Sequence, residues 1–236
     1  GEVAQLETLY GADPSRIEVV PPGVEHAFFS PGDRTGARRA LGIGDHPVLL
    51  FVGRIQPLKG LQVAVGALAE LARTDAELVV VGGPSGADGD AELQAVVELA
   101  ERLGVAGQVR FVPPQPHHLL STYYRAADVV VVPSRSESFG LVALEAAACG
   151  VPVVAAAVGG LRTLVDDGVT GHLVEERDPH AFAKALAQVL GDPAGAEAMG
   201  ERAAARARTY TWSTAAARLR RIYADLARRP LVDCTP

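Results

Sequence analysis

Residues 128–149 read DVVVVPSRSESFGLVALEAAAC, and this stretch decides how the chain folds. The apolar run after Asp128 is typical of a buried parallel strand. A polar loop follows it and leads into an Ala-rich segment with strong helix propensity, which begins at Leu141. A buried strand, a short loop and a helix in this order predict one unit of an α/β fold.

Two carboxylates flank the start of this predicted helix. Glu137 lies in the loop, and Glu145 lies about two turns into the helix. If residues 137–145 were all helical, the two side chains would stand roughly 12 Å apart, because a helix rises ~1.5 Å per residue. That distance is too long for two acids that share one proton. We therefore expect a long, hydroxyl-rich ligand that lies across the helix end and is held at both places.

The same pattern recurs along the chain, with apolar strand-like runs separated by amphipathic segments. The predicted strands are residues 17–20, 47–53, 77–83, 109–112, 128–132, 152–156 and 172–174. The predicted helices are residues 2–10, 61–73, 91–103, 117–127, 141–149 and most of 179–229. This alternation predicts an α/β protein with a single Rossmann-like, doubly wound parallel sheet and extra C-terminal helices. We expect the sheet domain over residues 18–190, the extra helices over 191–230 and a frayed tail over 231–236.

The composition is that of an ordinary globular protein, with 236 residues, 48% hydrophobic residues and a net charge of −6. This acidic balance argues against a nucleic-acid-binding surface. No apolar run approaches the ~20 residues that a membrane-spanning helix needs. Cys149 and Cys234 do not make a disulfide framework, so we expect a reduced, cytoplasmic setting. We expect Cys149 to be a small buried residue rather than a reactive thiol.

Ligands of doubly wound folds bind beyond the carboxyl ends of the strands, where the loop of residues 53–60 offers a phosphate site. Gly53 permits close backbone approach, and Arg54 and Lys59 add two positive charges where the next helix begins. A helix amino end with two cations attracts phosphate. The segment carries neither a Walker loop nor a dinucleotide fingerprint. We therefore expect phosphate binding here, two strands away from the Glu137 segment, with a pair of surface charges as the simpler alternative.

The remaining loops leave alternatives open. The helix end at Gly140 offers N–H groups for a phosphate or for sugar hydroxyls. The proline-rich residues 112–116 could form a wall for a flat base or only a rigid connection. Residues 82–86 could approach a ligand or form only a flexible turn. The histidines show no strong metal spacing, and His117 with His118 fits the polar cap of a helix better than a zinc site.

Several motifs together resemble a known enzyme family. Glu137 and Glu145 have the E-x7-E spacing of retaining glycosyltransferases with two Rossmann-like domains, the GT-B architecture. Within that group the chain is similar to glycosyltransferase family 4. The motifs are VPPGV at 20–24, GR at 53–54, KG at 59–60, GG at 159–160 and DGVTG at 167–171. The resemblance covers only the carboxyl-terminal half of such an enzyme, so it implies a missing N-terminal Rossmann-like domain and makes residues 1–17 a linker helix.

The resemblance implies a role for each candidate site residue. Arg54 and Lys59 would bind the donor diphosphate, and Glu137 would bind the donor sugar; these three residues are the catalytic candidates. Glu145 would hold the ribose, and Gln115 would lie against the uracil. The donor site would be completed by Gly53, Phe139, Gly140 and Leu141. Catalysis would depend on preorganised positive charge against the leaving phosphate, with no metal required.

One branch of the family is especially similar, and it transfers N-acetylglucosamine from UDP to inositol phosphate. The expected donor is therefore UDP-GlcNAc and the expected acceptor a small hydroxylated molecule, although residues 60–61, Gly-Leu, depart from the Ala-Pro usual in that branch. A glycolipid, polysaccharide or natural product is the alternative acceptor. A stand-alone nucleotide-sugar-binding module without catalysis is the alternative of another class.

The same branch implies two further features. It carries a structural magnesium site made largely of backbone atoms, which would fall at Tyr124, Arg125, Ala127 and Val151. A homodimer is an expectation for the full-length enzyme, whereas the isolated 236-residue chain should be inactive or nearly so. A non-hydrolysing sugar-nucleotide epimerase would share the architecture, but its acid and base residues have no counterpart in this sequence.

Overall fold

The computed structural model describes residues 2–228, so the expected tail and Cys234 lie outside the described residues. Six parallel strands form one sheet in the order β3-β2-β1-β4-β5-β6, which confirms the predicted doubly wound fold. The strands are β1 (Val48–Val52), β2 (Glu77–Val81), β3 (Val109–Val112), β4 (Val129–Val132), β5 (Val153–Ala156) and β6 (Gly171–Val174).

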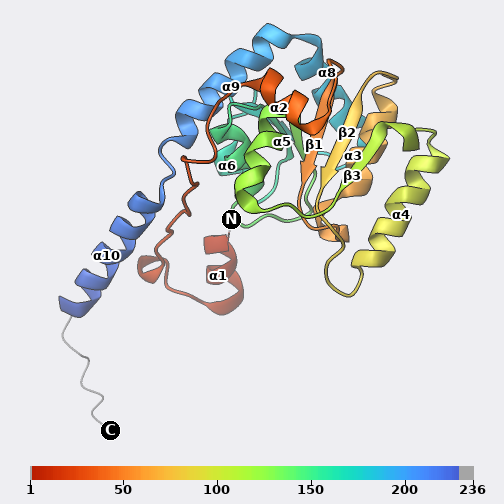
Figure 1. Ribbon diagram of the computed structural model, residues 1–236. Helices are drawn as coiled ribbons and strands as arrows, with labels where there is room; N and C mark the ends of the chain where they lie inside the picture. The colour runs from red at the N-terminus through yellow and green to blue at the C-terminus, as the bar shows by residue number, and fades with distance from the viewer. Residues whose placement is uncertain (1, 229–236) are drawn as a thin grey trace.

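Helices cover both faces of this sheet (Figure 1). They are α1 (Glu2–Tyr10), α2 (Arg34–Leu41), α3 (Leu61–Glu70), α4 (Gly89–Arg102), α5 (Leu120–Ala126), α6 (Leu141–Ala148), α7 (Leu161–Leu164), α8 (Pro179–Gly191), α9 (Pro193–Ala207) and α10 (Trp212–Arg228). Helices α3, α4 and α8 pack on one face, and α2, α5, α6 and α7 pack on the other. Helix α10 runs away from the sheet. No helix within residues 2–228 is long and apolar enough to cross a membrane.

The central strands are apolar throughout because both of their faces are buried. In β1, Leu50 enters the core beneath α5 and α6, whereas Leu49 enters the core beneath α3 and α8. Val130 and Val131 of β4 divide in the same way. Side chains alternate along a strand, so a strand covered on both faces carries an unbroken apolar run.

One predicted strand is wrong, because residues 17–20 join no sheet within the described chain. The two prolines that follow it lack backbone N–H groups, and Val19 is 55% exposed. This segment runs instead to the start of α10, where Val24 N donates to Tyr210 O at 3.1 Å. Helix α2 was not predicted because its sequence, RTGARRAL, has few apolar residues to give a period.

The strand order reverses between β1 and β4, and this position decides where a ligand can lie. The two strands pair directly, with Leu49 opposite Val129 and Leu50 opposite Val130. The sequence-based placement of their loops two strands apart is therefore wrong. The chain lays β2 and β3 on one side of β1 and then crosses through α5 to its other side. The loops after β1 and β4 consequently adjoin at the switch point, where open α/β sheets bind ligands.

Cys149 provides a test of how tightly the core is packed beneath α6. The thiol is 5% exposed, and burial raises its pKa to about 12. At pH 8 the thiolate fraction is then on the order of 10⁻⁴, whereas an ordinary thiol of pKa ≈ 8.5 is about a quarter ionised. We expect native protein treated with iodoacetamide at pH 8 to leave the Cys149 peptide unmodified by mass spectrometry. The same peptide should be alkylated fully in urea; rapid alkylation in the native protein would show that the core opens at α6.

Candidate active site at the switch point

A crevice of about 210 Å³ opens between the loop after β1 and the loop after β4. Its floor is formed by the carboxyl ends of these two strands, including Phe51 and Val132. Arg54, Lys59 and Glu137 supply its charged lining. The structure therefore brings together four of the residues singled out from the sequence: Gly53, Arg54 and Lys59 from the loop after β1, and Glu137 from the loop after β4.

Lys59 and Glu137 form an ion pair within this crevice. Lys59 Nζ donates to Glu137 Oε2 at 2.7 Å, and the two side chains are 21% and 20% exposed. One contact leaves the ammonium with further N–H donors and leaves Glu137 Oε1 as an acceptor. The pair therefore fixes both side chains without using up their hydrogen-bonding capacity.

The backbones of the two loops are also joined. Arg135 N donates to Leu58 O at 2.8 Å. Gly60 has a φ of +71°, and a Cβ there would stand 2.3 Å from Pro133 O, so this contact requires glycine. These contacts hold the 3-10 turn Pro57–Lys59, and Lys59 is its last residue, directly before α3.

Arg54 differs from Lys59 because its guanidinium has no partner within the described residues. Its side chain is exposed and makes no hydrogen bond or ion pair with any residue between 2 and 228. The loop around it is nevertheless anchored, since Ile55 N donates to Gly83 O at 2.8 Å and Gln56 Nε2 donates to Ser85 O at 2.9 Å. The loop after β2 therefore supports the loop after β1. Because Glu137 compensates Lys59, Arg54 gives the crevice a net formal charge of +1.

The Gly159-Gly160 motif holds the Glu137 loop from behind. Gly160 N donates to Glu137 O at 2.9 Å. Gly159 has a φ of +46°, and a Cβ there would lie 2.0 Å from Glu137 O. A Cβ on Gly160 would lie 2.5 Å from the backbone of Phe139. No side chain fits between these backbones, so the two glycines allow the close approach that positions Glu137.

Helix α6 begins beside the same loop. Its cap, Gly140, has a φ of +101°, and the first-turn N–H groups after it have no acceptor within the helix. Leu141 is exposed, and Val142 lines the crevice. The Phe139 ring packs against Tyr210 with centroids 5.8 Å apart. The donor-binding roles of Gly53, Phe139, Gly140 and Leu141 stay predictions.

Glu145 lies apart from these charges and does not line the crevice. It is 7% exposed, so it is not a solvated helix residue. Its Oε2 accepts a hydrogen bond from the Tyr124 hydroxyl at 2.8 Å, and its Oε1 lies 2.7 Å from His117 Nε2. Burial, and then the charge of Glu145, raise the pKa of Tyr124 well above its usual range, so the hydroxyl keeps its proton and donates. The ribose role of Glu145 stays a prediction.

The partners of Glu145 were missed from the sequence. His117 does not serve as a helix cap; it reaches Glu145 from the 3-10 turn that precedes α5. The available signal was spacing, because His117 and Tyr124 are two helical turns apart and so share one face. Gln115, expected against a base, is half-buried, and its Nε2 donates to Pro113 O at 2.9 Å. Its contact with uracil stays a prediction.

The structural magnesium site at Tyr124, Arg125, Ala127 and Val151 stays a prediction, because its expected ligands are largely backbone atoms, although two of the side chains have other partners. Arg125 is itself a cation, and its guanidinium donates to Ser30 O and Phe28 O. The Tyr124 hydroxyl is occupied by Glu145, and its carbonyl accepts from Ala127 N at 3.0 Å. Within the described residues no group of three or more His, Cys, Asp or Glu could hold a metal.

Comparison with known proteins gives consistent matches. The family described as Glycosyl transferases group 1 matches residues 33–206, which include both loops of the crevice. The D-inositol 3-phosphate glycosyltransferase of Kribbella flavida is 51% identical over 222 residues, covering 91% of this chain and 52% of that protein. The chain thus spans about half the length of the curated relatives it matches.

Solved structures extend the comparison to the fold. Sucrose-phosphate synthase from Thermosynechococcus elongatus has a TM-score of 0.87 and 34% identity, over 96% of this chain and 57% of that one. The C-terminal domain of a glycosyl transferase group 1 family protein from Francisella tularensis has a TM-score of 0.72 and 26% identity, over 79% of this chain and 97% of that one. The predicted relation to one half of the GT-B architecture is confirmed at the level of the fold.

Substitution of Gly160 tests the close approach behind Glu137. Gly160→Ala places a methyl group against the Phe139 backbone, so we expect a loss of about 1–3 kcal/mol in the free energy of unfolding. Gly107→Ala is the matched control, because a Cβ there meets nothing within 4 Å. Urea denaturation followed by circular dichroism measures both. Equal stability of the two variants would contradict the steric account of the loop.

Proposed function

The chain belongs to the glycosyl transferases group 1 family, as its motifs predicted, and on this premise we propose that it forms the nucleotide-sugar-binding half of a hexosyltransferase. The observation that carries the proposal is the crevice at the β1–β4 switch point, with two cations and one carboxylate on adjoining loops. A nucleoside diphosphate sugar has an anionic diphosphate next to a ring of hydroxyls. Arg54 and Lys59 suit the diphosphate, and Glu137 suits the sugar hydroxyls.

The proposed reaction is transfer of the sugar with retention of configuration at its anomeric carbon. The bond between that carbon and the diphosphate oxygen breaks, a bond to the acceptor hydroxyl oxygen forms on the same face, and the hydroxyl proton passes to the leaving diphosphate. Negative charge grows on the leaving diphosphate. Arg54, Lys59 and the first-turn N–H groups of α6 would stabilise this charge from fixed positions, so no reorganisation is needed as the charge develops. Glu137 would orient the sugar while its ion pair keeps Lys59 in place.

UDP-GlcNAc is the proposed donor, and inositol phosphate is the proposed acceptor. The name of the Kribbella flavida relative supports this acceptor, at 51% identity. A glycolipid, polysaccharide or natural product is the alternative within the same chemistry. Calorimetric titration of the purified chain with UDP-GlcNAc, UDP-Glc and GDP-Man separates the donors. Tightest binding of GDP-Man would overturn the proposed nucleotide.

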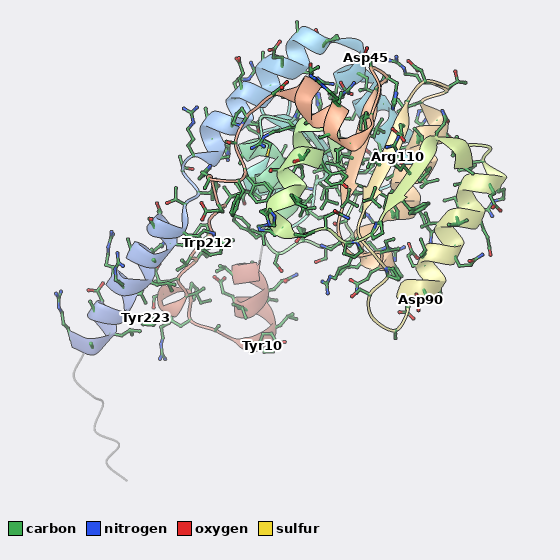
Figure 2. The ribbon with its side chains drawn as sticks, viewed as in Figure 1. Tyr10, Asp45, Asp90, Arg110, Trp212 and Tyr223 are labelled. Atoms are coloured by element: carbon green, nitrogen blue, oxygen red, sulfur yellow. The ribbon has the colours of Figure 1, made fainter. Side chains whose placement is uncertain are left out.

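We place the acceptor site in a second, N-terminal Rossmann-like domain of a longer protein. The length of the relatives supports this, and so do exposed apolar side chains on α1 and α10. Figure 2 labels three of them, Tyr10, Trp212 and Tyr223, which are 77%, 54% and 64% exposed. A surface of this kind is typical of an interface between domains. The linker role of residues 1–17, the cytoplasmic setting and a homodimer of the longer protein stay predictions.

A nucleotide-sugar-binding module without catalysis is the alternative of another class. Both proposals predict that this chain binds a nucleotide sugar and transfers little or nothing by itself. They differ in the longer protein, where only the enzyme converts UDP-GlcNAc and inositol phosphate to UDP and a glycoside. Release of UDP that depends on the acceptor supports the enzyme. Measurable transfer by the isolated chain would contradict the placement of the acceptor site in another domain.

Removing either cation tests the phosphate assignment. Arg54→Ala and Lys59→Ala should each weaken UDP binding about 10- to 100-fold, because a charge-assisted hydrogen bond contributes ~1.5–3 kcal/mol. Lys184→Ala is the matched control, since Lys184 is the other lysine of the sequence and lies exposed on α8. Isothermal titration calorimetry with UDP measures all three variants. Unchanged affinity in either crevice variant would remove that residue from the site.

A further inference from the structure

Glu145 has an environment that the proposed function does not explain. A carboxylate that only met solvent and ligand would need no fixed protein partners. Glu145 is instead buried, and each of its two oxygens has a partner from outside α6. Both partners, Tyr124 and His117, lie on the segment that follows β3.

The Tyr124 contact is rigid. The side chain is fully buried, with 0% exposure, and its hydroxyl donates to Oε2. The Phe29 ring, also 0% exposed, packs edge-on against Tyr124 with centroids 5.9 Å apart. The Phe29 segment is fixed in turn, because Arg125 Nε donates to Ser30 O at 2.8 Å. A tyrosine in such surroundings cannot change rotamer without disturbing the core.

The His117 contact is closer to solvent. Its ring nitrogen Nε2 lies 2.7 Å from Oε1 and donates, because a carboxylate oxygen accepts. The His117 side chain as a whole is 62% exposed. The ring is tilted against Phe29, with centroids 4.8 Å apart. Phe29 therefore packs against both partners of Glu145, the exposed His117 and the buried Tyr124.

These contacts fix the one torsion of Glu145 that would otherwise be loose. Rotation about the last bond of a glutamate side chain is broad, so a carboxylate on a helix does not by itself face one direction. Because a hydrogen-bond donor contacts each of its two oxygens, the Glu145 carboxylate is held in a single plane. An ionised carboxylate has about four lone-pair positions, and two of them are taken here. Two remain, which matches the two hydroxyls of a vicinal diol.

We propose that Tyr124 and His117 are positioning residues, which clamp the Glu145 carboxylate so that its free lone pairs receive the 2′- and 3′-hydroxyls of the donor ribose. This inference rests on the proposed function, since it takes the ligand to be a ribonucleoside diphosphate. Its consequence is specificity: the clamp makes the site discriminate a ribonucleotide from a 2′-deoxyribonucleotide. A residue with a merely structural role would affect both ligands equally.

The experiment compares UDP with 2′-deoxy-UDP by isothermal titration calorimetry on the purified chain. We expect the native chain to bind UDP at least tenfold more tightly, the loss for one charge-assisted hydrogen bond. Tyr124→Phe removes only the hydroxyl, and His117→Ala removes the exposed donor. Each should lower the UDP preference to threefold or less. His117→Gln retains an N–H donor and should restore it.

The neighbouring residues provide matched controls. Tyr123→Phe and His118→Ala change the same residue types one position away, where neither side chain contacts Glu145, so the preference should stay at the native value. Equal weakening of UDP and 2′-deoxy-UDP in Tyr124→Phe and His117→Ala would overturn the clamp. Because His117 is exposed, its variant tests the clamp even if Tyr124→Phe fails to fold. A native chain that binds neither ligand would instead refute the proposed function.

Discussion

The parallel pairing of β1 with β4 is the constraint on which the site depends. These strands meet where the order of the sheet reverses, so the loops that leave their carboxyl ends adjoin without a helix between them. The Lys59–Glu137 ion pair joins these loops at 2.7 Å, and a backbone hydrogen bond holds the same two loops together. Gly60 and the Gly159-Gly160 pair allow those backbones to approach to distances that a side chain would prevent. Fold and chemistry are thus linked through glycine positions.

The charged side chains of the crevice differ in whether they have a partner. Lys59 is compensated by Glu137, whereas Arg54 has no partner within the described residues. An uncommitted guanidinium suits the first contact with a diphosphate, because its fork can meet two oxygens at once. The Lys59–Glu137 pair suits the junction between diphosphate and sugar, since it presents a donor and an acceptor side by side. Glu145 lies in a separate place, where its partners come from the segment after β3.

The sequence predicts the parts of this molecule that local chemistry determines. Unbroken valine runs such as β4 occur where a strand is covered on both faces, and Gly60 and Gly140 mark helix starts. The sequence does not predict which distant segments lie next to one another. The adjacency of β1 and β4 depends on which side of the sheet the chain returns to, and no local pattern encodes that choice. Residues 17–20 looked like a strand because their apolar content is the same whether they join a sheet or run beside α10. The His117–Glu145 contact joins residues 28 apart, so burial of Glu145 became apparent only in the structure.

The most direct test of this account is a crystal structure of the chain with UDP-GlcNAc bound. The account predicts the diphosphate against Arg54 and Lys59, the sugar hydroxyls on the free oxygen of Glu137, and the ribose on Glu145. It also predicts that Glu145 keeps its contacts with Tyr124 and His117. A donor bound at the opposite edge of the sheet, or one whose diphosphate makes no contact with either cation, would contradict the central claim that the β1–β4 crevice is the donor site.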